Sequence, residues 1–331
     1  MFVVTELPVA ILFCVITMLG WGSWANTQKL AGKEKWGFAL FYWDYALGVL
    51  LFSVVWALTL GSAGSAGMGA MANLSGAGRP ALWDAFLSGI EFNVANILLV
   101  VAIDAAGMSV AFPIGVGLAL VIGTVKSYLQ DPRGNATLLF CGVTLIVAAM
   151  ALSAMAYSKL PQAPGRKWFR GVAFAVVAGA LMGFFYPQLM RAISPNFQQA
   201  PIQVGLLTPY SALVFFALGL VASNVVVNTV FLKTSGLSYL DYFAGSARLH
   251  SLGLLGGVIW MLALSLNVLA SSVAGPAISY ALGQGATLVA AVWGVFVWRE
   301  FRDAPAGVNP LIVAMLAGYV GGLILIGVAT Q

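Results

Sequence analysis

Two carboxylates stand inside long apolar segments of this chain. Glu91 lies in the segment 84–103, and Asp44 lies in the segment 38–60. A carboxylate within hydrocarbon costs about 2.5–3.5 kcal/mol on insertion scales, and desolvation favours its protonated form. Both residues are therefore candidates for carrying a proton. The alternative for Glu91 is a hydrogen-bonded side chain that holds two helices together. For Asp44 the alternatives are contacts with solute hydroxyls or an ion pair with a lysine such as Lys29.

Neutral polar and aromatic side chains form a second set of candidates. Tyr280, Gln284 and Thr287 follow the i, i+4, i+7 spacing, which places them on one face of a helix. An amide offers two donors and one acceptor, so Gln284 suits the hydroxyl or amide edge of a solute. The alternative is a bond from Gln284 to the backbone of a neighbouring helix. Other apolar segments contain further amides and two tryptophans, which are Asn93, Asn96, Asn224, Asn228, Trp260 and Trp24. Aromatic faces stack on sugars and on heterocycles alike.

The composition limits the class of protein that these residues serve. Of 331 residues, 61% are hydrophobic and only 8% are charged, and the mean hydropathy is +0.97. A soluble chain carries roughly 25% charged residues, so a cytosolic enzyme, a nucleic-acid binder and a disordered scaffold are excluded. His250 is the one histidine, so we expect no multi-histidine metal site, and we expect no cofactor. We place His250 at the membrane interface.

Apolar runs of about 20 residues recur along the chain, which is the length needed to cross a bilayer as a helix. We predict an all-α integral membrane protein with ten transmembrane helices. We interpret the glycine-rich segment 61–80 as a flexible connector, and we expect the first helix to be interrupted near Gly20–Trp24. The predicted spans are 7–26, 38–60, 84–103, 107–126, 136–157, 170–190, 207–231, 252–270, 274–297 and 309–329.

A basic segment, 158–170, separates five predicted helices from five. We predict a five-helix repeat over 1–157, a cytoplasmic linker at 158–170 and a second repeat over 171–331. An odd number of helices in each half places the halves in opposite orientations, which makes an inverted repeat. Residues 110–123 align with 278–291 at a constant offset of 168, with matching glycines, leucine and valine.

Lysine and arginine counts predict the orientation in the membrane. With the N-terminus outside, the cytoplasmic loops hold 11 of these residues and the outer loops hold 4. We therefore predict a multi-pass protein of the cell (inner) membrane with both termini on the non-cytoplasmic side. The cytoplasmic set is Lys29, Lys33, Lys35, Lys159, Arg166, Lys167, Arg170, Lys233, Arg248, Arg299 and Arg302, and the outer set is Arg79, Lys126, Arg133 and Arg191.

Several segments resemble the drug/metabolite transporter superfamily. WGVFVWREF (293–301) resembles the motif that ends the ninth helix in many members. Asn96 with AGMSVAFPIGVGLALVIGT (106–124) resembles the third-to-fourth helix region of bacterial rhamnose–proton symporters. TPYSALVFFALG (208–219) and LGGVIWML (255–262) resemble their seventh and eighth helices.

The first two helices are more similar to plant ureide permeases, through FYWDYALG (41–48) and TLG (59–61). Together the resemblances imply the branch that holds glucose/ribose porters, rhamnose symporters and ureide permeases. Both the rhamnose symporters and the ureide permeases carry a glutamine in the eighth helix where this chain has Ala263, so we expect a substrate contact to differ here.

We therefore predict a secondary active transporter, not an enzyme, which imports a small neutral polar solute with a proton by alternating access. The chain has no GxxxxGK[ST] run for ATP, and it has few buried basic residues to clamp an anion. The resemblance to sugar porters favours a monosaccharide, and the alternative is a ureide or nucleobase. An integral-membrane enzyme and a structural membrane protein are the alternatives of a different class.

The expected partners are the solute, the proton and the lipid bilayer, without nucleic acid, and a homodimer is left open. The solute is expected near the membrane midplane, between the segment 274–297 and the asparagines.

Overall fold

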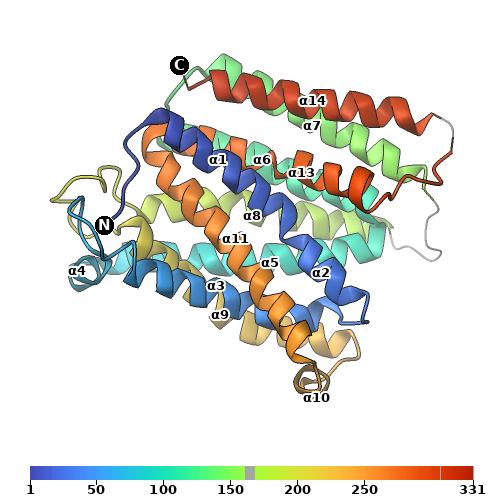
Figure 1. The fold of residues 1–331 in the computed structure, drawn as a ribbon, viewed down its shortest axis with the longest axis horizontal. Coiled ribbons are helices and arrows are strands. Elements are labelled where there is room, and N and C mark those ends of the chain that lie inside the picture. Colours follow the sequence, from blue (N-terminus) through green and yellow to red (C-terminus); the bar gives the residue numbers. More distant parts are fainter. Residues whose placement is uncertain (161–167, 306, 331) are drawn as a thin grey trace. The chain divides into compact units, whose positions relative to one another are not determined.

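The computed structural model describes residues 1–160, 168–305 and 307–330. Within them, ten helices are long and apolar enough to cross a membrane, which confirms the predicted fold class. The described residues contain no strand, only isolated bridges such as that between Ala77 and Gly205. The ten spans (Figure 1) are α1 (Leu7–Ser23) with α2 (Ala25–Gly32), α3 (Phe38–Leu58), α5 (Arg79–Ala106), α6 (Met108–Gln130), α7 (Ala136–Ser158), α8 (Trp168–Ala192), α9 (Pro209–Thr234), α11 (Ala247–Ala274), α12 (Pro276–Gly283) with α13 (Ala286–Val292) and the π-helix η1 (Trp293–Val297), and α14 (Val308–Val328).

Local sequence sets several helix ends. Asn135 begins α7, because its side chain accepts a hydrogen bond from the Leu138 amide at 3.1 Å. Thr208 caps α9 in the same way and is followed by Pro209, whose missing N–H costs nothing in the first turn. The first span is interrupted at Trp24, as the sequence predicts.

The chain forms two compact units. Unit 1 consists of Met1–Asn93 with Gln188–Val273, and unit 2 consists of Val94–Pro187 with Ala274–Gln331. The predicted basic linker 158–170 lies mostly outside the described residues, so the division of the sequence into halves stays a prediction.

The helix bounds repeat along the sequence at the offset of 168. Helices α5 and α11 each have 28 residues, and they run from Arg79 to Ala106 and from Ala247 to Ala274. Each is followed by a glycine at positive φ, Gly107 at 86° and Gly275 at 84°, where a residue with a Cβ would be strained. The next helices then begin at corresponding positions, Met108 and Pro276. This agreement is consistent with the predicted internal repeat.

The glycine-rich segment 61–80 is not the flexible connector that we expected. It contains a short helix, α4 (Ala70–Ser75), with Asn73 buried on it. The Asn73 side chain donates to the Leu206 carbonyl at 3.0 Å and accepts from the Thr208 amide at 2.8 Å. The glycine-rich composition could not show that the segment is held in place, because this depends on one asparagine that bonds backbone groups far away in the sequence.

Glycines bring helices into backbone contact inside each unit. In unit 1, a Cβ on Gly48 of α3 would meet the Leu254 carbonyl of α11, and a Cβ on Gly257 would meet the Tyr45 carbonyl. In unit 2, Gly142 of α7 and Gly322 of α14 face one another in the same manner, and the two helices lie side by side (Figure 1). Small residues at such contacts are the usual basis of close helix packing in membranes.

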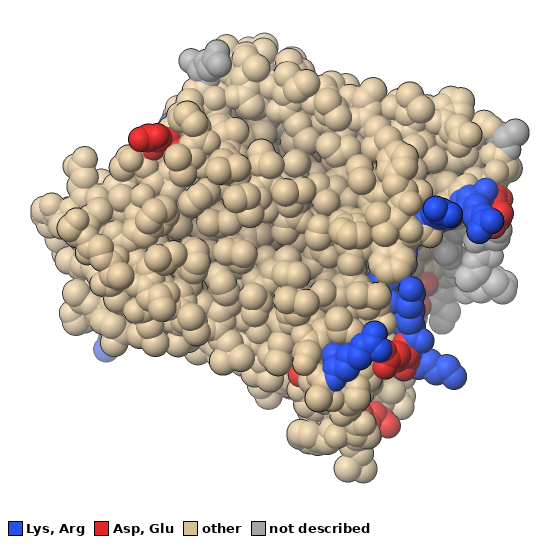
Figure 2. Space-filling view, in the orientation of Figure 1, with Lys and Arg blue, Asp and Glu red and all other residues tan. Residues whose placement is uncertain are grey.

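The outer surface is mostly free of charge. On the face drawn in Figure 2, apolar and neutral residues cover nearly the whole area, and Lys and Arg gather near the end of α2. A surface of this kind suits a lipid environment, where charged side chains are costly.

Candidate functional site

Asp44 is buried in unit 1 against two side chains from much later in the sequence. The Tyr242 hydroxyl donates to Asp44 Oδ1 at 2.7 Å. His250 Nδ1 lies 3.0 Å from Oδ1 and 2.9 Å from Oδ2. The Asp44 side chain is 4% exposed and that of His250 is 26% exposed. The partners that the structure gives Asp44 are His250 and Tyr242, and the expected alternative, an ion pair with a lysine such as Lys29, is not among them.

The packing of α3 on α11 explains how these groups meet. Gly253 of α11 lies directly against the Asp44 side chain, so α11 passes close enough for His250 to reach the carboxylate. Tyr242 comes from α10 (Tyr239–Phe243), which begins with a capping box between Ser238 and Asp241. Trp36 flanks the cluster, with its ring centroid 5.4 Å from that of His250 and 6.3 Å from that of Tyr242. We call Asp44, His250, Tyr242 and Trp36 the Asp44 cluster.

The surroundings of Tyr242 keep its hydroxyl protonated, so that it donates a hydrogen bond to Asp44. Burial, with the hydrogen bond to Asp44, raises the pKa of Tyr242 above its ordinary value. The phenol therefore stays protonated throughout the physiological pH range. His250 lies in the first turn of the transmembrane helix α11 and pairs with the buried Asp44, which the expectation of a simple interfacial histidine did not foresee. No spacing rule links residues about 200 positions apart, so the sequence analysis did not find this pair.

An aromatic cluster surrounds Trp260 in unit 1. The Trp260 ring centroid lies 4.2 Å from that of Phe92, 5.8 Å from Phe216 and 6.1 Å from Trp21. Tyr45 lies 6.4 Å from Trp260 and 5.0 Å from Trp24, so it joins the two predicted tryptophans. Sequence reasoning missed Tyr45. We call Trp21, Trp24, Tyr45, Phe92, Phe216 and Trp260 the aromatic cluster.

The predicted asparagines of unit 1 have different environments. Asn93 donates to the Ser223 hydroxyl at 2.9 Å, and Asn228 donates to the Ala39 carbonyl at 2.9 Å. Asn224 is fully buried, yet neither polar atom of its amide has a partner among the residues that the structure describes. Such a group needs an explanation, because native structures satisfy most buried polar atoms.

Contacts at both ends of the α3–α9 pair locate Asn224. Asn228 meets Ala39 near one end, and the Tyr210 and Trp56 rings lie 6.3 Å apart near the other. The helices are therefore antiparallel, and one turn in from Asn228 places Asn224 opposite Trp43, in the turn of α3 that also holds Tyr45. The Tyr45 hydroxyl and Trp21 Nε1 are also buried without a partner among the described residues.

The remaining predicted residues lie in unit 2, apart from Glu91. Gln284 hydrogen-bonds to Tyr280, whose hydroxyl also lies 3.3 Å from the Ala119 carbonyl. The Thr287 hydroxyl donates to the Gln284 carbonyl at 3.0 Å. Asn96 is 6% exposed on α5. Glu91 is half-buried on α5 in unit 1, and it is not among the hydrogen-bond partners of Asp44.

The span that carries Gln284 is interrupted at that residue. Helix α12 ends at Gly283 and α13 begins at Ala286. The Gly285 and Thr287 amides donate to carbonyls three residues back, at 2.9 and 3.1 Å, instead of four. The sequence predicted one continuous span here. Transporters use discontinuous helices at their binding sites, since the loosened turn frees backbone groups.

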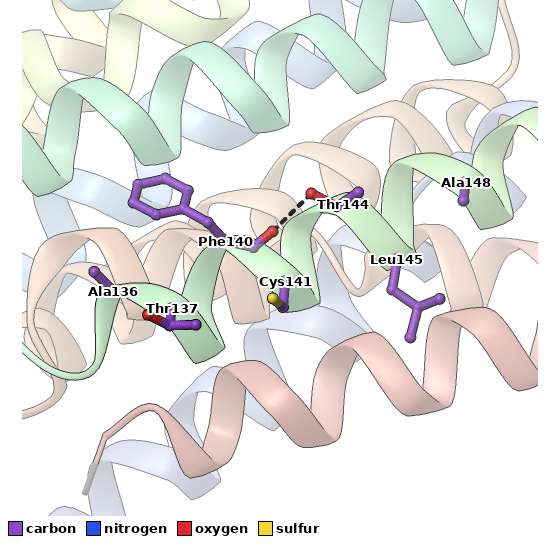
Figure 3. Close-up of a pocket in the computed structure, with 7 residues that line it drawn as sticks. All are labelled: Ala136, Thr137, Phe140, Cys141, Thr144, Leu145 and Ala148. Carbon is purple, nitrogen blue, oxygen red and sulfur yellow. Dashed lines mark hydrogen bonds between the residues drawn. The ribbon is translucent and has the colours of Figure 1, made fainter.

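An open groove runs along α7 and contains none of the predicted site residues. Its lining residues all belong to one helix (Figure 3), and they are Ala136, Thr137, Phe140, Cys141, Thr144, Leu145 and Ala148. Thr144 donates to the Phe140 carbonyl of its own helix at 2.8 Å. The groove therefore offers a mostly apolar surface to a neighbouring lipid chain.

Ten apolar helices with buried carboxylate and amide groups and a half-buried imidazole define a multi-spanning membrane protein with a polar interior, as transporters have. The chain belongs to the ureide permease family, whose model matches residues 41–163 and 161–328.

Individual relatives agree over nearly the full length. Ureide permease 1 of Arabidopsis thaliana is 22% identical over 94% of both chains, and ureide permease 4 of the same plant is 21% identical over 98% of both. A crystal structure that is 14% identical has the same fold, with a TM-score of 0.62 over 97% of this chain and 96% of that one.

Membership in this family settles the class of activity. Ureide permeases are transporters and not enzymes, so the protein is a membrane transporter. The resemblance that the sequence showed in the first two helices extends over the whole chain. The expected monosaccharide has no such support, and the alternative, a ureide or nucleobase, fits the relatives better.

Proposed function

We propose that the protein is a secondary transporter of small neutral ureides or nucleobases, driven by the proton gradient. The observation that carries the substrate class is the Asn224 amide, whose donor and acceptor are both buried without a partner among the described residues. A cyclic ureide or a nucleobase presents an N–H beside a C=O in one plane. A primary amide pairs with that edge through two parallel hydrogen bonds, one in each direction.

The aromatic cluster supports the same class of solute. Trp260, Tyr45 and Trp24 present flat apolar surface near the turn where the α3–α9 register places Asn224. Stacking on such rings favours a planar heterocycle, and offset stacking is worth about 0.5–1.5 kcal/mol beyond area burial. A puckered sugar also stacks through its C–H face, but it does not offer the planar donor–acceptor edge.

Coupling to protons is the second part of the proposal. Asp44 and Glu91 are carboxylates within membrane spans, which is an expensive position that calls for a function. Gln284, Tyr280 and Thr287 remain proposed substrate contacts, supported by the interruption of their span at Gln284. Asn96 of α5 also remains a proposed contact.

An exchange assay with purified protein in liposomes tests the substrate class. Liposomes are loaded with an unlabelled solute, and the uptake of labelled allantoin, uracil and hypoxanthine is compared with that of glucose and rhamnose. We expect exchange for at least one ureide or nucleobase and none for the sugars. Exchange of a sugar without exchange of any heterocycle would overturn the proposed class. Protein-free liposomes provide the background.

A further inference from the structure

We propose that Asp44 and His250 form the site that binds the coupling proton, and that its occupancy holds α10 in place through Tyr242. The inference deepens the proposed function, since it assigns the coupling step of that transport to named residues. It rests on the proposed function only for its role in transport, because binding of the proton itself requires no solute.

The geometry defines where the proton goes. With Asp44 ionised and His250 neutral, the Nδ1–H of the imidazole donates to the carboxylate, whose oxygens lie 2.9 and 3.0 Å away. The lone pair then remains on Nε2. A proton that binds Nε2 forms one N–H bond and converts the pair into an imidazolium facing a carboxylate. Charge-assisted hydrogen bonds of this kind are roughly twice as strong as neutral ones.

The exposure of the two side chains gives them different tasks. The carboxylate is 4% exposed, whereas the imidazole is 26% exposed. Solution protons therefore reach the imidazole first. Gly245 lies on the Nε2 side, and a Cβ there would crowd both Nε2 and the Trp36 ring. The missing side chain keeps that side of the imidazole from being blocked.

The surrounding titratable groups do not change charge in the same pH range. Burial and Asp44 raise the pKa of Tyr242 above its ordinary value, and hydrogen bonds from Ser238 lower the pKa of Asp241. Glu34 is paired with Arg248 at 2.5 Å at the same end of unit 1. The other charged residues of the elements that pack there are Lys29 on α2, Lys33 and Lys35 on the following turn, and Lys233 on α9. Lysine and arginine ordinarily titrate well above pH 8, whereas an imidazole is the side chain whose ordinary charge change falls between pH 5 and 8.

Helix α10 is positioned to respond to this pair. It has only five residues, and Tyr242 is bonded to the same Asp44 oxygen that His250 approaches. A second tyrosine, Tyr239, contacts the Thr229 hydroxyl and the Trp43 ring. The His250 ring also packs edge-on against the Tyr242 ring, with the centroids 4.9 Å apart. When the proton leaves, the attraction between imidazole and carboxylate weakens and His250 is free to turn away, so α10 loses this ring contact and is held less firmly.

The first experiment reads the proton directly. Because the chain has one histidine, labelling with ¹⁵N-histidine gives a single imidazole signal from the whole protein. Its titration is compared between wild type and Asp44→Asn. We expect the variant to lower the midpoint by about one pH unit or more, since a carboxylate within 4–6 Å stabilises the imidazolium. An unchanged midpoint would overturn the site.

The second experiment follows α10. Amide hydrogen exchange of residues 239–245 is measured at pH 6 and pH 8 in wild type, His250→Gln and Tyr242→Phe. Taking the ratio of wild type to variant at each pH removes the intrinsic pH dependence of exchange. We expect His250→Gln to exchange at least about threefold faster than wild type at pH 6 and similarly at pH 8. Tyr242→Phe should exchange faster at both. If the ratio of the exchange rates of wild type and His250→Gln were the same at both pH values, control of α10 by the proton would be excluded.

The third experiment links the site to transport. Asp44→Asn and His250→Gln should lose accumulation driven by an imposed pH gradient but keep solute exchange at equal pH. Full gradient-driven accumulation in both variants would exclude the coupling role. If wild type exchanges no ureide or nucleobase, the proposed substrate class fails, while the first two experiments still decide the proton site.

Discussion

Asn224 and Asn228 are both asparagines and lie one helical turn apart, but they differ in what their amides contact. Asn228 donates to the Ala39 carbonyl, whereas Asn224 has no protein partner among the described residues. A bond inside the protein contributes to stability, and we propose that the Asn224 amide, which makes none, is available to the solute. Sequence spacing predicted the pair as one kind of residue, because a spacing cannot show which side chain finds a carbonyl.

Replacing each asparagine by alanine should therefore give opposite results. Asn224→Ala should weaken solute binding by roughly 5- to 150-fold, equal to about 1–3 kcal/mol for an unpaired partner, and leave the melting temperature close to wild type. Asn228→Ala should lower the melting temperature, because the buried Ala39 carbonyl loses its donor. Equilibrium binding and thermal melting of the two purified variants measure both effects. Equal losses of binding in both would contradict the distinction.

The pH response of the α10 cap follows from Asp241. Hydrogen bonds from the Ser238 side chain and amide lower the pKa of the exposed Asp241 carboxyl. A lowered pKa in the folded protein means that the cap stabilises α10 above the ordinary value near 4 and loses this effect as the pH falls through the folded pKa. Amide exchange of 239–243 should therefore rise, after correction for its intrinsic rate, only below about pH 4. Ser238→Ala should weaken this transition, because only the Ser238 amide still donates to Asp241, and should leave the His250-dependent transition in place.

At the scale of elements, the α3–α11 contact positions the Asp44 cluster. Gly48, Gly253 and Gly257 let the two backbones approach, and a Cβ on Gly48 or Gly257 would strike a backbone carbonyl that cannot move aside. The spans themselves could be predicted from the sequence, because their apolar length is unmistakable. This contact could not be predicted, because glycine is frequent in every span and its neighbours are set by packing.

Gly48→Ala should therefore separate α3 from α11. We expect a loss of about 1–3 kcal/mol of stability, as for other overpacked sites, and a lower midpoint for the His250 titration because Asp44 moves away. Gly32→Ala in α2 is the matched control, since no atom lies near its added methyl group. A Gly48→Ala variant with the wild-type melting temperature would contradict the contact.

The interruption between α12 and α13 gives a second prediction at this scale. Gln284 lies at the loosened turn, and Val116 occupies the matching position of the continuous helix α6. Gln284→Ala should weaken solute binding by roughly 5- to 150-fold. Val116→Ala should bind like wild type, because valine supplies only apolar surface. If Val116→Ala lost binding and Gln284→Ala did not, the solute contacts would lie on the repeat that holds Val116, and the proposed role of Gln284 would be wrong. Sequence spacing did not reveal the interruption, since the flanking glycines also fit an unbroken helix.

For the whole molecule, the basic residues predict the orientation. In unit 1, Lys29, Lys33, Lys35 and Arg248 lie at the end that holds Glu34 and the start of α3, and Arg191 pairs with Asp84 near the start of α5. The side with more lysine and arginine is ordinarily cytoplasmic. A reporter that is active only outside the cytoplasm should work at the C-terminus and fail after Lys233. The reverse result would place both termini in the cytoplasm and the Asp44 cluster on the outer side of the membrane.

The equal bounds of α5 and α11 have a consequence for the history of the chain. If the offset of 168 records a duplication, then positions 168 apart began with the same residue, and their present differences show where the two copies have diverged. Gly107 and Gly275 have kept their bend, so both copies still need it. Pro113 and Val116 in one copy stand against Ala281 and Gln284 in the other. On that premise, one copy gained or lost the interruption at Gln284 after the duplication, and exchanging 113–117 for 281–285 would test whether these five positions carry it.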